Sequence, residues 1–365
     1  MRRQDFTATA MLAALLSTTA VAAAQTPAPA GTARPSAEAR PALWPQIPHR
    51  LKRDPKVEAR VAAMLRRMSV EDKVGQLLQV DIASIKPADL ETYKIGSILN
   101  GGNSAPNNDE FAPASEWLKL FDAFYDASVK RSDGRPVVPV IWGTDAVHGA
   151  NNIVGATLFP HNIGLGAARN PDLIRRIGAA TAVETAATGI DWSFAPTVAV
   201  VQDDRWGRTY ESYSEDPSIV ESYAGAMVEG IQGQVGRDFM KSGHVIASVK
   251  HFLGDGGTGG RDQGDTRVSE EVLRDVHLAG YRTGLASGAL TVMPSFSSWN
   301  GTKMTGNRSL LTDVLKNRMG FDGFTIGDWN AHGQVPGCTN EDCAAAINAG
   351  LDMVMYSGPG WKQLY

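Results

Sequence analysis

A carboxylate and an indole stand side by side in the stretch Gly320–Asn330, which reads G-F-D-G-F-T-I-G-D-W-N. The apolar run Phe324–Ile326 is bounded by glycines, which predicts a short buried strand of a parallel sheet. Asp328 and Trp329 follow that strand directly. A carboxylate that acts as nucleophile or base, beside a flat apolar face, suits chemistry on a pyranose ring. The structural alternative is that Asp328 caps the helix that follows.

Four further polar side chains stand at or just after predicted strand ends: Asp145, Arg208, Lys250 and His251. Asp145 can accept hydrogen bonds from two sugar hydroxyls, whereas Lys250 and Arg208 can donate them. His251 can bond a hydroxyl in its neutral form. Because the carboxyl ends of parallel barrel strands meet at one edge, we expect these side chains to share one site.

Structural roles remain open for several of these groups. Arg208 could serve only to pair with Glu211 or Asp204, and Lys250 could be only a buried ion-pair partner. The stretch Gly254–Gly259 matches G-x-G-x-x-G and follows a strand. It does not open a helix, and no Lys-Ser/Thr pair follows it, so a nucleotide site is disfavoured.

Strand-like and helix-like segments alternate from about residue 57 onward. Strands are expected at 78–82, 95–99, 137–142, 190–194, 245–252, 290–295, 324–326 and 351–356. Eight strands that alternate with helices favour an α/β fold of the closed (β/α)8 TIM-barrel type over an open doubly wound sheet. Because the chain stops at Tyr365, we expect the barrel to be truncated near its last helix.

Capping signals and apolar stripes predict the helices between these strands. They are expected at 57–68, 70–78, 115–129, 170–188, 216–231, 269–285, 308–319 and 342–348. Ser69 followed by Asp72 is typical of a capped helix start. In the first helix, Val61, Met64 and Leu65 share one face.

The first residues have the pattern of an export signal. A basic pair, Arg2-Arg3, precedes the apolar stretch Thr7–Ala24, and Val21–Ala24 offers a small-residue cleavage site. We therefore predict a signal peptide at 1–24, a disordered lead-in at 25–48 rich in Pro and Ala, and a barrel domain at 49–365. The expected location is periplasmic or secreted. No cysteine lies near the cleavage site, so a lipid anchor there is excluded, and we expect no membrane anchor.

Charge and cysteine content exclude other classes of protein. The net charge of −4 and the pI of about 6.0 give no electrostatic footprint for nucleic acid. The two cysteines, Cys338 and Cys343, are spaced so that a disulfide is compatible but not required. Two cysteines without further ligands nearby do not make a zinc site, and we predict neither a metal nor a cofactor.

Six stretches of the sequence resemble the N-terminal barrel domain of glycoside hydrolase family 3, in particular exo-acting β-glucosidases and β-glucan glucohydrolases. They are 143–152, 156–166, 204–217, 250–258, 297–301 and 323–329. The resemblance implies that Asp328 is the nucleophile of a retaining mechanism and that Trp329 flanks the sugar beyond the scissile bond. The same resemblance implies that the non-reducing-end sugar is held by Asp145, Arg208, Lys250 and His251, with Met293 lining its pocket and Asp262 as a further acidic contact.

The resemblance also implies partners that this chain does not contain. Glucosidases of the family take their general acid/base, a Glu, from a second α/β domain, which is absent from this chain. The single-barrel hexosaminidase branch uses a His after the K-H-F motif, but no His lies between Phe252 and Val276. We therefore expect an exported retaining β-glucosidase domain acting on β-linked glucose oligosaccharides, with the isolated chain inactive or weakly active. A β-xylosidase and a non-catalytic sugar-binding barrel are the alternatives.

Overall fold

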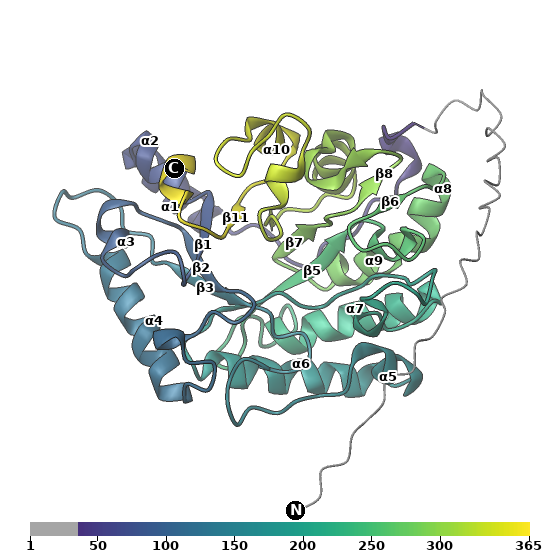
Figure 1. Cartoon of the computed structure of the whole chain (residues 1–365), viewed down its shortest axis with the longest axis horizontal. Coiled ribbons are helices and arrows are strands. Elements are labelled where there is room, and N and C mark those ends of the chain that lie inside the picture. Colours follow the sequence, from purple (N-terminus) through teal and green to yellow (C-terminus); the bar gives the residue numbers. More distant parts are fainter. Residues whose placement is uncertain (1–35) are drawn as a thin grey trace, which may run out of the picture. The chain divides into compact units, whose positions relative to one another are not determined.

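The computed structural model describes residues 36–365, so the predicted signal peptide lies outside the described part. Eight parallel strands form the main sheet (Figure 1). They are β1 Leu78–Asp81, β2 Ser97–Asn100, β3 Ile141–Thr144, β4 Trp192–Ser193, β5 Ile246–Phe252, β7 Thr291–Pro294, β10 Phe324–Thr325 and β11 Val354–Tyr356. All eight predicted strands are confirmed, each within a few residues of its expected bounds.

The strands follow one another around the sheet in chain order, from β11 through β1, β2, β3, β4, β5 and β7 to β10. A parallel bridge between Ile326 and Met353 joins the two edge strands. This order of neighbours, with every pair parallel, is that of a (β/α)8 barrel. The barrel fold predicted from the sequence is thereby confirmed.

Helices connect the strands on the outside of the sheet. The longer ones are α4 Ala114–Val129, α6 Pro171–Ala186, α7 Pro217–Gln232, α9 Ala279–Ala286 and a π-helix at Ser309–Arg318. Figure 1 shows α4, α6, α7 and α9 outside the strands. The shorter ones are α2 Val70–Gly75, α3 Asp89–Thr92, α5 Asn162–Ala167, α8 Glu270–Val272, a π-turn at Leu273–His277 and α10 Ala344–Ala349. Ser69 and Asp72 form the expected reciprocal cap at the start of α2.

The last helix is present only as one turn. We expected no helix after the last strand, but α11, Trp361–Leu364, follows β11. Its Trp361 is buried, packs edge-on against Tyr93 and donates its indole N–H to the carbonyl of Ser84. A helical turn therefore follows β11, which the sequence reading did not predict.

Apolar side chains fill the barrel interior. One buried cluster combines side chains from strands all around the barrel: Leu99, Trp192, Phe194, Met293, Ile326, Met353 and Met355. Trp192 packs edge-on against Phe194 and Phe324 and donates its indole N–H to Thr291. This apolar cluster fills the barrel interior beneath the carboxyl ends of the strands.

The segment before the barrel differs from its prediction. We expected a disordered lead-in over 25–48, yet Trp44 is 1% exposed and Ile47 is 8% exposed. Trp44 donates its indole N–H to Glu270, and Arg40 forms an ion pair with the same carboxylate. Two apolar anchors and one buried acceptor thus order residues 36–48, which their Pro- and Ala-rich composition did not indicate.

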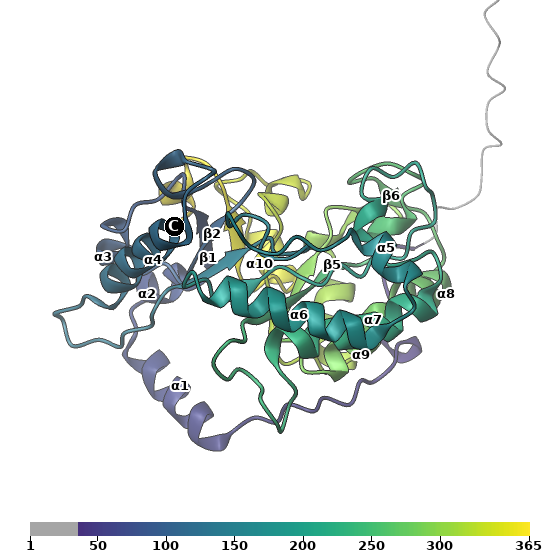
Figure 2. The same ribbon diagram turned by 90° about the horizontal axis from the view of Figure 1, so that it is seen from below.

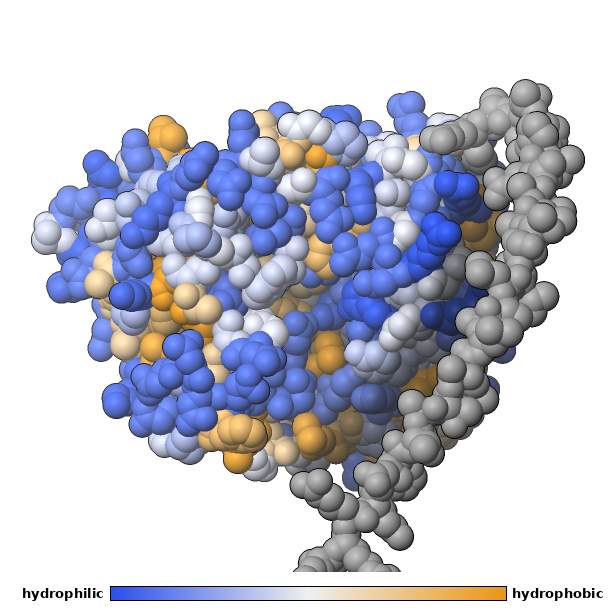
Figure 3. Space-filling view, in the orientation of Figure 1, coloured by the Kyte–Doolittle hydropathy of each residue, from blue (hydrophilic) through white to orange (hydrophobic). Residues whose placement is uncertain are grey.

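The first helix, α1 Pro55–Arg67, contributes no buried residue. Val61 and Leu65 on its predicted apolar face are 45% and 46% exposed. Figure 2 shows α1 apart from the other helices. Elsewhere, hydrophilic residues cover most of the face in Figure 3, and its hydrophobic residues form small separate groups.

Two short features complete the fold. A small sheet of β6 Asp265–Thr266, β8 Ser298–Trp299 and β9 Thr302–Lys303 is built from segments that follow β5 and β7 in the chain, and it was not predicted. Cys338 and Cys343 are joined as a disulfide. Within residues 36–365, no helix has the length and apolar character needed to cross a membrane.

Candidate active site

A pocket of about 350 Å³ opens at the carboxyl ends of the strands, and we call it the strand-end pocket. It brings together seven of the eight predicted site residues: Asp145, Arg208, Lys250, His251, Met293, Asp328 and Trp329. These residues come from five different strand–loop junctions, so only the folded barrel assembles them. The eighth, Asp262, does not line this pocket, and its side chain is exposed in the loop before β6.

Strand β5 sends two consecutive side chains, Lys250 and His251, into the strand-end pocket. A regular strand directs neighbouring side chains to opposite faces. Here the pairing of β5 with β7 shifts its register between Lys250 and Phe252. An irregularity of this kind re-aims a side chain next to a site, which accounts for the two polar groups lying together.

Lys250 and Asp145 form an ion pair across the pocket, with 2.6 Å between Lys250 Nζ and Asp145 Oδ1. The Lys250 side chain is 6% exposed, whereas that of Asp145 is 47% exposed. The ammonium group of Lys250 therefore lies deep in the pocket, and the carboxylate of Asp145 lies nearer to the opening. Both the ion-pair role and a role in sugar binding are compatible with this geometry, because each group has hydrogen-bonding capacity left over.

Arg208 is held by Glu211 through two parallel hydrogen bonds of 2.7 and 2.9 Å. The same guanidinium also donates to His251 Nε2 at 3.2 Å. Burial tends to raise the pKa of Glu211, but the hydrogen bond and charge of Arg208 outweigh it, and the pKa lies below its usual value. Glu211 is therefore ionised and orients the fork of Arg208.

His251 is fixed from its other side by Asp255, whose carboxylate lies 2.9 Å from Nδ1. Burial lowers the pKa of His251 well below its usual value, so the ring is neutral. Because Arg208 can only donate, Nε2 must accept and Nδ1 must carry the proton. Burial raises the pKa of Asp255 to about 7, and this carboxyl points at the ring rather than into the pocket.

Asp328 lies at the centre of these groups, and its side chain is 16% exposed. Its Oδ1 accepts the backbone N–H of Trp329 at 2.7 Å, while its Oδ2 lies 3.6 Å from His251 Nε2. Asp328 Oδ2 and His251 Nε2 are both acceptors, so they form no hydrogen bond with each other. Asp328 Oδ2 therefore remains available to a ligand. Burial raises the pKa of Asp328 to about 6, against the opposing effect of Lys250.

The helix-capping alternative for Asp328 is wrong. The next helical turn, Ala331–Gln334, is preceded by Asn330 and has no side-chain capping bond. Trp329 is 36% exposed and packs over Gly101, where an added Cβ would lie 1.9 Å from the indole ring. The carboxylate and the indole therefore both border the pocket, as the sequence predicted.

Two functional side chains were missed as members of the site. Glu211 was considered only as a structural partner of Arg208, and Asp255 was assigned no role. Their signals were the spacings Arg-x-x-Glu and His-x-x-x-Asp, which here join residues three and four apart. Such spacings are common, so only the fold shows that both pairs meet at one point.

Comparison with known proteins gives one consistent family. The sequence model of the Glycosyl hydrolase family 3 N terminal domain matches residues 69–365. The lysosomal beta glucosidase of Dictyostelium discoideum is 30% identical over 317 residues, which are 80% of this chain and 38% of that protein. The periplasmic beta-glucosidase of Salmonella typhimurium is 30% identical over 309 residues, 82% of this chain and 37% of that protein.

A solved structure agrees with these relatives. The crystal structure of an exo-1,3/1,4-beta-glucanase from a Pseudoalteromonas species is 55% identical, with a TM-score of 0.86. The match covers 88% of this chain and 40% of that one. The chain therefore spans less than half the length of each of these three proteins.

Proposed function

Since the chain belongs to glycosyl hydrolase family 3, we propose that it is the barrel domain of an exported β-glucosidase. In this proposal the enzyme releases glucose from the non-reducing ends of β-glucan oligosaccharides. The names of the relatives support a β-glucoside substrate. The predicted signal peptide and the periplasmic relative support export.

The position of Asp328 carries the proposal. A retaining glycosidase needs a carboxylate that attacks the anomeric carbon and a second carboxyl that protonates the leaving oxygen. Asp328 Oδ2 is free to attack, and Lys250 and Arg208 lie close enough to favour its ionised form. The covalent step then joins Oδ2 to the anomeric carbon as the bond to the leaving oxygen breaks.

The other carboxyls that line the strand-end pocket or lie directly behind it are committed elsewhere. Asp145 is paired with Lys250, Glu211 with Arg208, and Asp255 lies behind His251. None is placed as an uncommitted proton donor. We therefore assign the general acid/base to a second domain of the full-length protein, and the isolated chain should act on glycosides with good leaving groups only.

The remaining polar groups match the hydroxyls of a terminal sugar. Asp145 supplies a charged acceptor, while Lys250 and Arg208 supply charged donors. His251, whose tautomer is fixed, shapes the floor beside Asp328. The pocket volume of about 350 Å³ suits a small ligand, which is consistent with action at a chain end.

Trapping the covalent intermediate tests this function. A 2-deoxy-2-fluoro-β-glucoside with a dinitrophenolate leaving group needs no general acid, so this chain should be labelled one sugar per protein. Peptide mapping by mass spectrometry should place the label on Asp328. The Asp328→Asn variant should remain unlabelled, and Asp122→Asn, at an exposed position on α4, should be labelled like wild type.

A β-xylosidase and a non-catalytic sugar-binding barrel would give different results in the same experiment. The corresponding 2-fluoroxyloside lacks the hydroxymethyl group, and faster labelling by it would indicate a β-xylosidase. Binding of glucose without labelling by either reagent would indicate a sugar-binding barrel. A label on another carboxylate would remove Asp328 from the role of nucleophile.

A further inference from the structure

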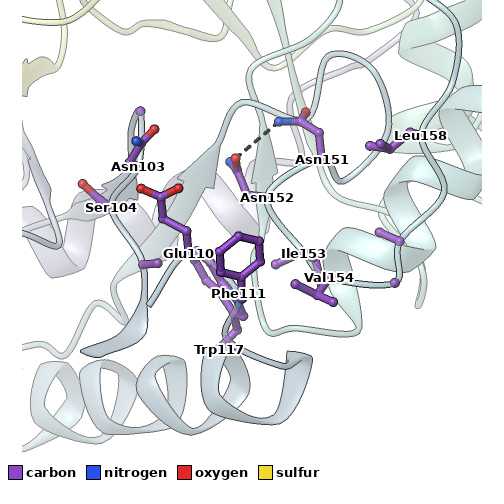
Figure 4. Close-up of a pocket in the computed structure, with 14 residues that line it drawn as sticks. Asn103, Ser104, Glu110, Phe111, Trp117, Asn151, Asn152, Ile153, Val154 and Leu158 are labelled. Atoms are coloured by element: carbon purple, nitrogen blue, oxygen red, sulfur yellow. Dashed lines mark hydrogen bonds between the residues drawn. The ribbon is translucent and has the colours of Figure 1, made fainter. Parts of the chain in front are cut away.

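A second pocket of about 320 Å³ opens beside the strand-end pocket, and Gly102 and Asn151 line both. We call it the asparagine pocket, after the side chains of Asn103, Asn151 and Asn152 that line it (Figure 4). The two pockets meet only at the rim formed by Gly102 and Asn151. A cavity that continues directly from a catalytic pocket is the natural place for the rest of a chain-like substrate.

The lining of the asparagine pocket has the chemistry of a sugar site. Amide groups can both donate to and accept from hydroxyls, and the carboxylate of Glu110 adds a charged acceptor. Phe111 offers an aromatic face and is 80% exposed, the largest exposure of the large hydrophobic side chains within residues 36–365. Figure 4 shows Glu110, Asn103 and Asn152 on the same side of the Phe111 ring.

Both walls of this pocket are fixed to strand ends. On one side, Asp81 at the end of β1 accepts hydrogen bonds from the Gly101 N–H at 2.9 Å and the Ser104 hydroxyl at 2.8 Å. On the other side, Asn152 donates to Thr144 at 3.1 Å, immediately before Asp145. The pocket is therefore preorganised, which lowers the entropic cost of binding.

The lining of the asparagine pocket includes a largely buried aromatic residue. Trp117 lines the pocket and is 1% exposed. Its indole N–H has no hydrogen-bond partner among the described residues.

The asparagine pocket is also connected to the proposed leaving-group side of the active site. Trp329, next to Asp328, packs directly over Gly101. Gly101 begins the loop that carries Phe111. A chain that passes over Trp329 away from Asp328 therefore reaches Gly102 and then the asparagine pocket.

We propose that the asparagine pocket binds glucosyl units of the substrate beyond the one that adjoins the scissile bond, with Phe111 as the stacking surface. This inference rests on the proposed function. It makes the enzyme prefer tri- and tetrasaccharides to disaccharides and leaves recognition of the terminal glucose unchanged.

Binding measurements on the chain test the proposal without a need for turnover. The dissociation constants of glucose, laminaribiose, laminaritetraose and cellotetraose are measured by ligand-observed NMR. The variants are Phe111→Ala, Phe111→Tyr and Asn103→Ala, at positions that are exposed and not part of the core. Val183→Ala, an exposed apolar position on α6 (56%) away from the pocket, is the matched control.

Wild-type protein should bind at least one tetrasaccharide more tightly than the disaccharide. Phe111→Ala should weaken that binding by about 3- to 10-fold, as expected for one stacked ring, while Phe111→Tyr and Val183→Ala should not. Glucose binding should be the same in all variants. Tetrasaccharide binding that Phe111→Ala and Asn103→Ala leave intact would overturn the inference alone. Wild-type protein that binds no glucose would contradict the proposed function and the inference together.

Discussion

His251 Nδ1 lies 2.9 Å from a carboxylate oxygen of Asp255, and both side chains are buried. This contact settles which ring nitrogen is protonated, because Arg208 donates to the opposite nitrogen. Asp328 then faces a nitrogen lone pair rather than an N–H. Oδ2 of Asp328, the proposed nucleophile, is thus kept free of a hydrogen bond from His251 by Asp255, which does not itself border the pocket.

Replacement of Asp255 should act through His251. Asp255→Ala leaves a buried N–H without an acceptor and should slow labelling by the fluoroglucoside about 10- to 100-fold, the range seen when a supporting hydrogen bond is lost. Asp255→Asn keeps an acceptor oxygen and should be closer to wild type. The check is the labelling rate across pH 4.5–8 together with a thermal melt. Equal rates for the Ala variant and wild type would show that Asp255 is not a positioning residue.

The buried Asp328 should cost the protein stability. Its pKa is about 6 in the folded protein against 3.8 ordinarily, so between these pH values the unfolded chain has lost the proton and the folded one retains it. Stability attributable to this group therefore falls from pH 3.8 to about 6. Asp328→Asn should raise the free energy of unfolding at pH 7 by up to about 3 kcal/mol, at about 1.4 kcal/mol per pKa unit.

The gain from Asp328→Asn should shrink as the pH approaches 4, because the carboxyl of the unfolded wild-type chain is then close to half protonated and differs less from the protonated folded form. Urea denaturation at pH 4 and pH 7 measures it, with Asp122→Asn on the exposed face of α4 as the control. A gain of the same size at both pH values would show that burial of the charge is not its cause.

The sequence predicted where the polar groups stand but not how they meet. The short apolar runs, each followed by a polar residue, were enough to place Asp145 and Asp328 at strand ends, because parallel barrel strands all point the same way. The shared orientation of Lys250 and His251 was not predictable. It depends on a local shift of register in β5, which no periodicity shows.

The sequence also did not predict correctly which segments are buried. The apolar stripe of α1 resembles a core-facing helix, yet the fold leaves Val61 and Leu65 exposed. Conversely, the lead-in around Trp44 lacks any regular pattern, yet it docks on the barrel through hydrogen bonds of Arg40 and Trp44 to Glu270 and through the buried Trp44 and Ile47 side chains. Amphipathic patterns and composition describe what a segment can bury, whereas the partner surface decides whether it does so.

Asp145→Asn should weaken glucose binding more than it alters the fold. The Asp145 side chain is 47% exposed, and an asparagine there keeps an amide oxygen that can still accept a hydrogen bond from Lys250, whose side chain is 6% exposed. Each hydrogen bond to a charged acceptor is worth about 1.5–3 kcal/mol. We expect about a 10- to 100-fold higher dissociation constant for glucose and a nearly unchanged melting temperature. Calorimetric titration beside a thermal melt provides both values, and unchanged affinity would assign Asp145 a structural role.

Glu211→Gln should destabilise the fold by leaving Arg208 without its counter-charge. The Arg208 and Glu211 side chains are 25% and 9% exposed, so the pair is largely screened from water. Loss of one partner of a buried pair costs about 3–5 kcal/mol, and the partial exposure of Arg208 places the expected loss at the lower end. Because the pKa of Glu211 is lowered in the fold, this contribution is present above pH 4.5 and is lost as the pH falls through the folded-state value.

The matched control for Glu211→Gln is Glu58→Gln. Glu58 pairs with Arg53 at 3.7 Å, and the two side chains are 51% and 65% exposed. An exposed pair of this kind contributes about 0–1 kcal/mol. Urea denaturation of both variants at pH 7 and pH 4 should show a large loss for Glu211→Gln at pH 7 and a smaller one at pH 4. Losses of equal size at the two positions would mean that the Arg208–Glu211 fork is no more than a surface ion pair, and that Arg208 is oriented in the strand-end pocket by other contacts.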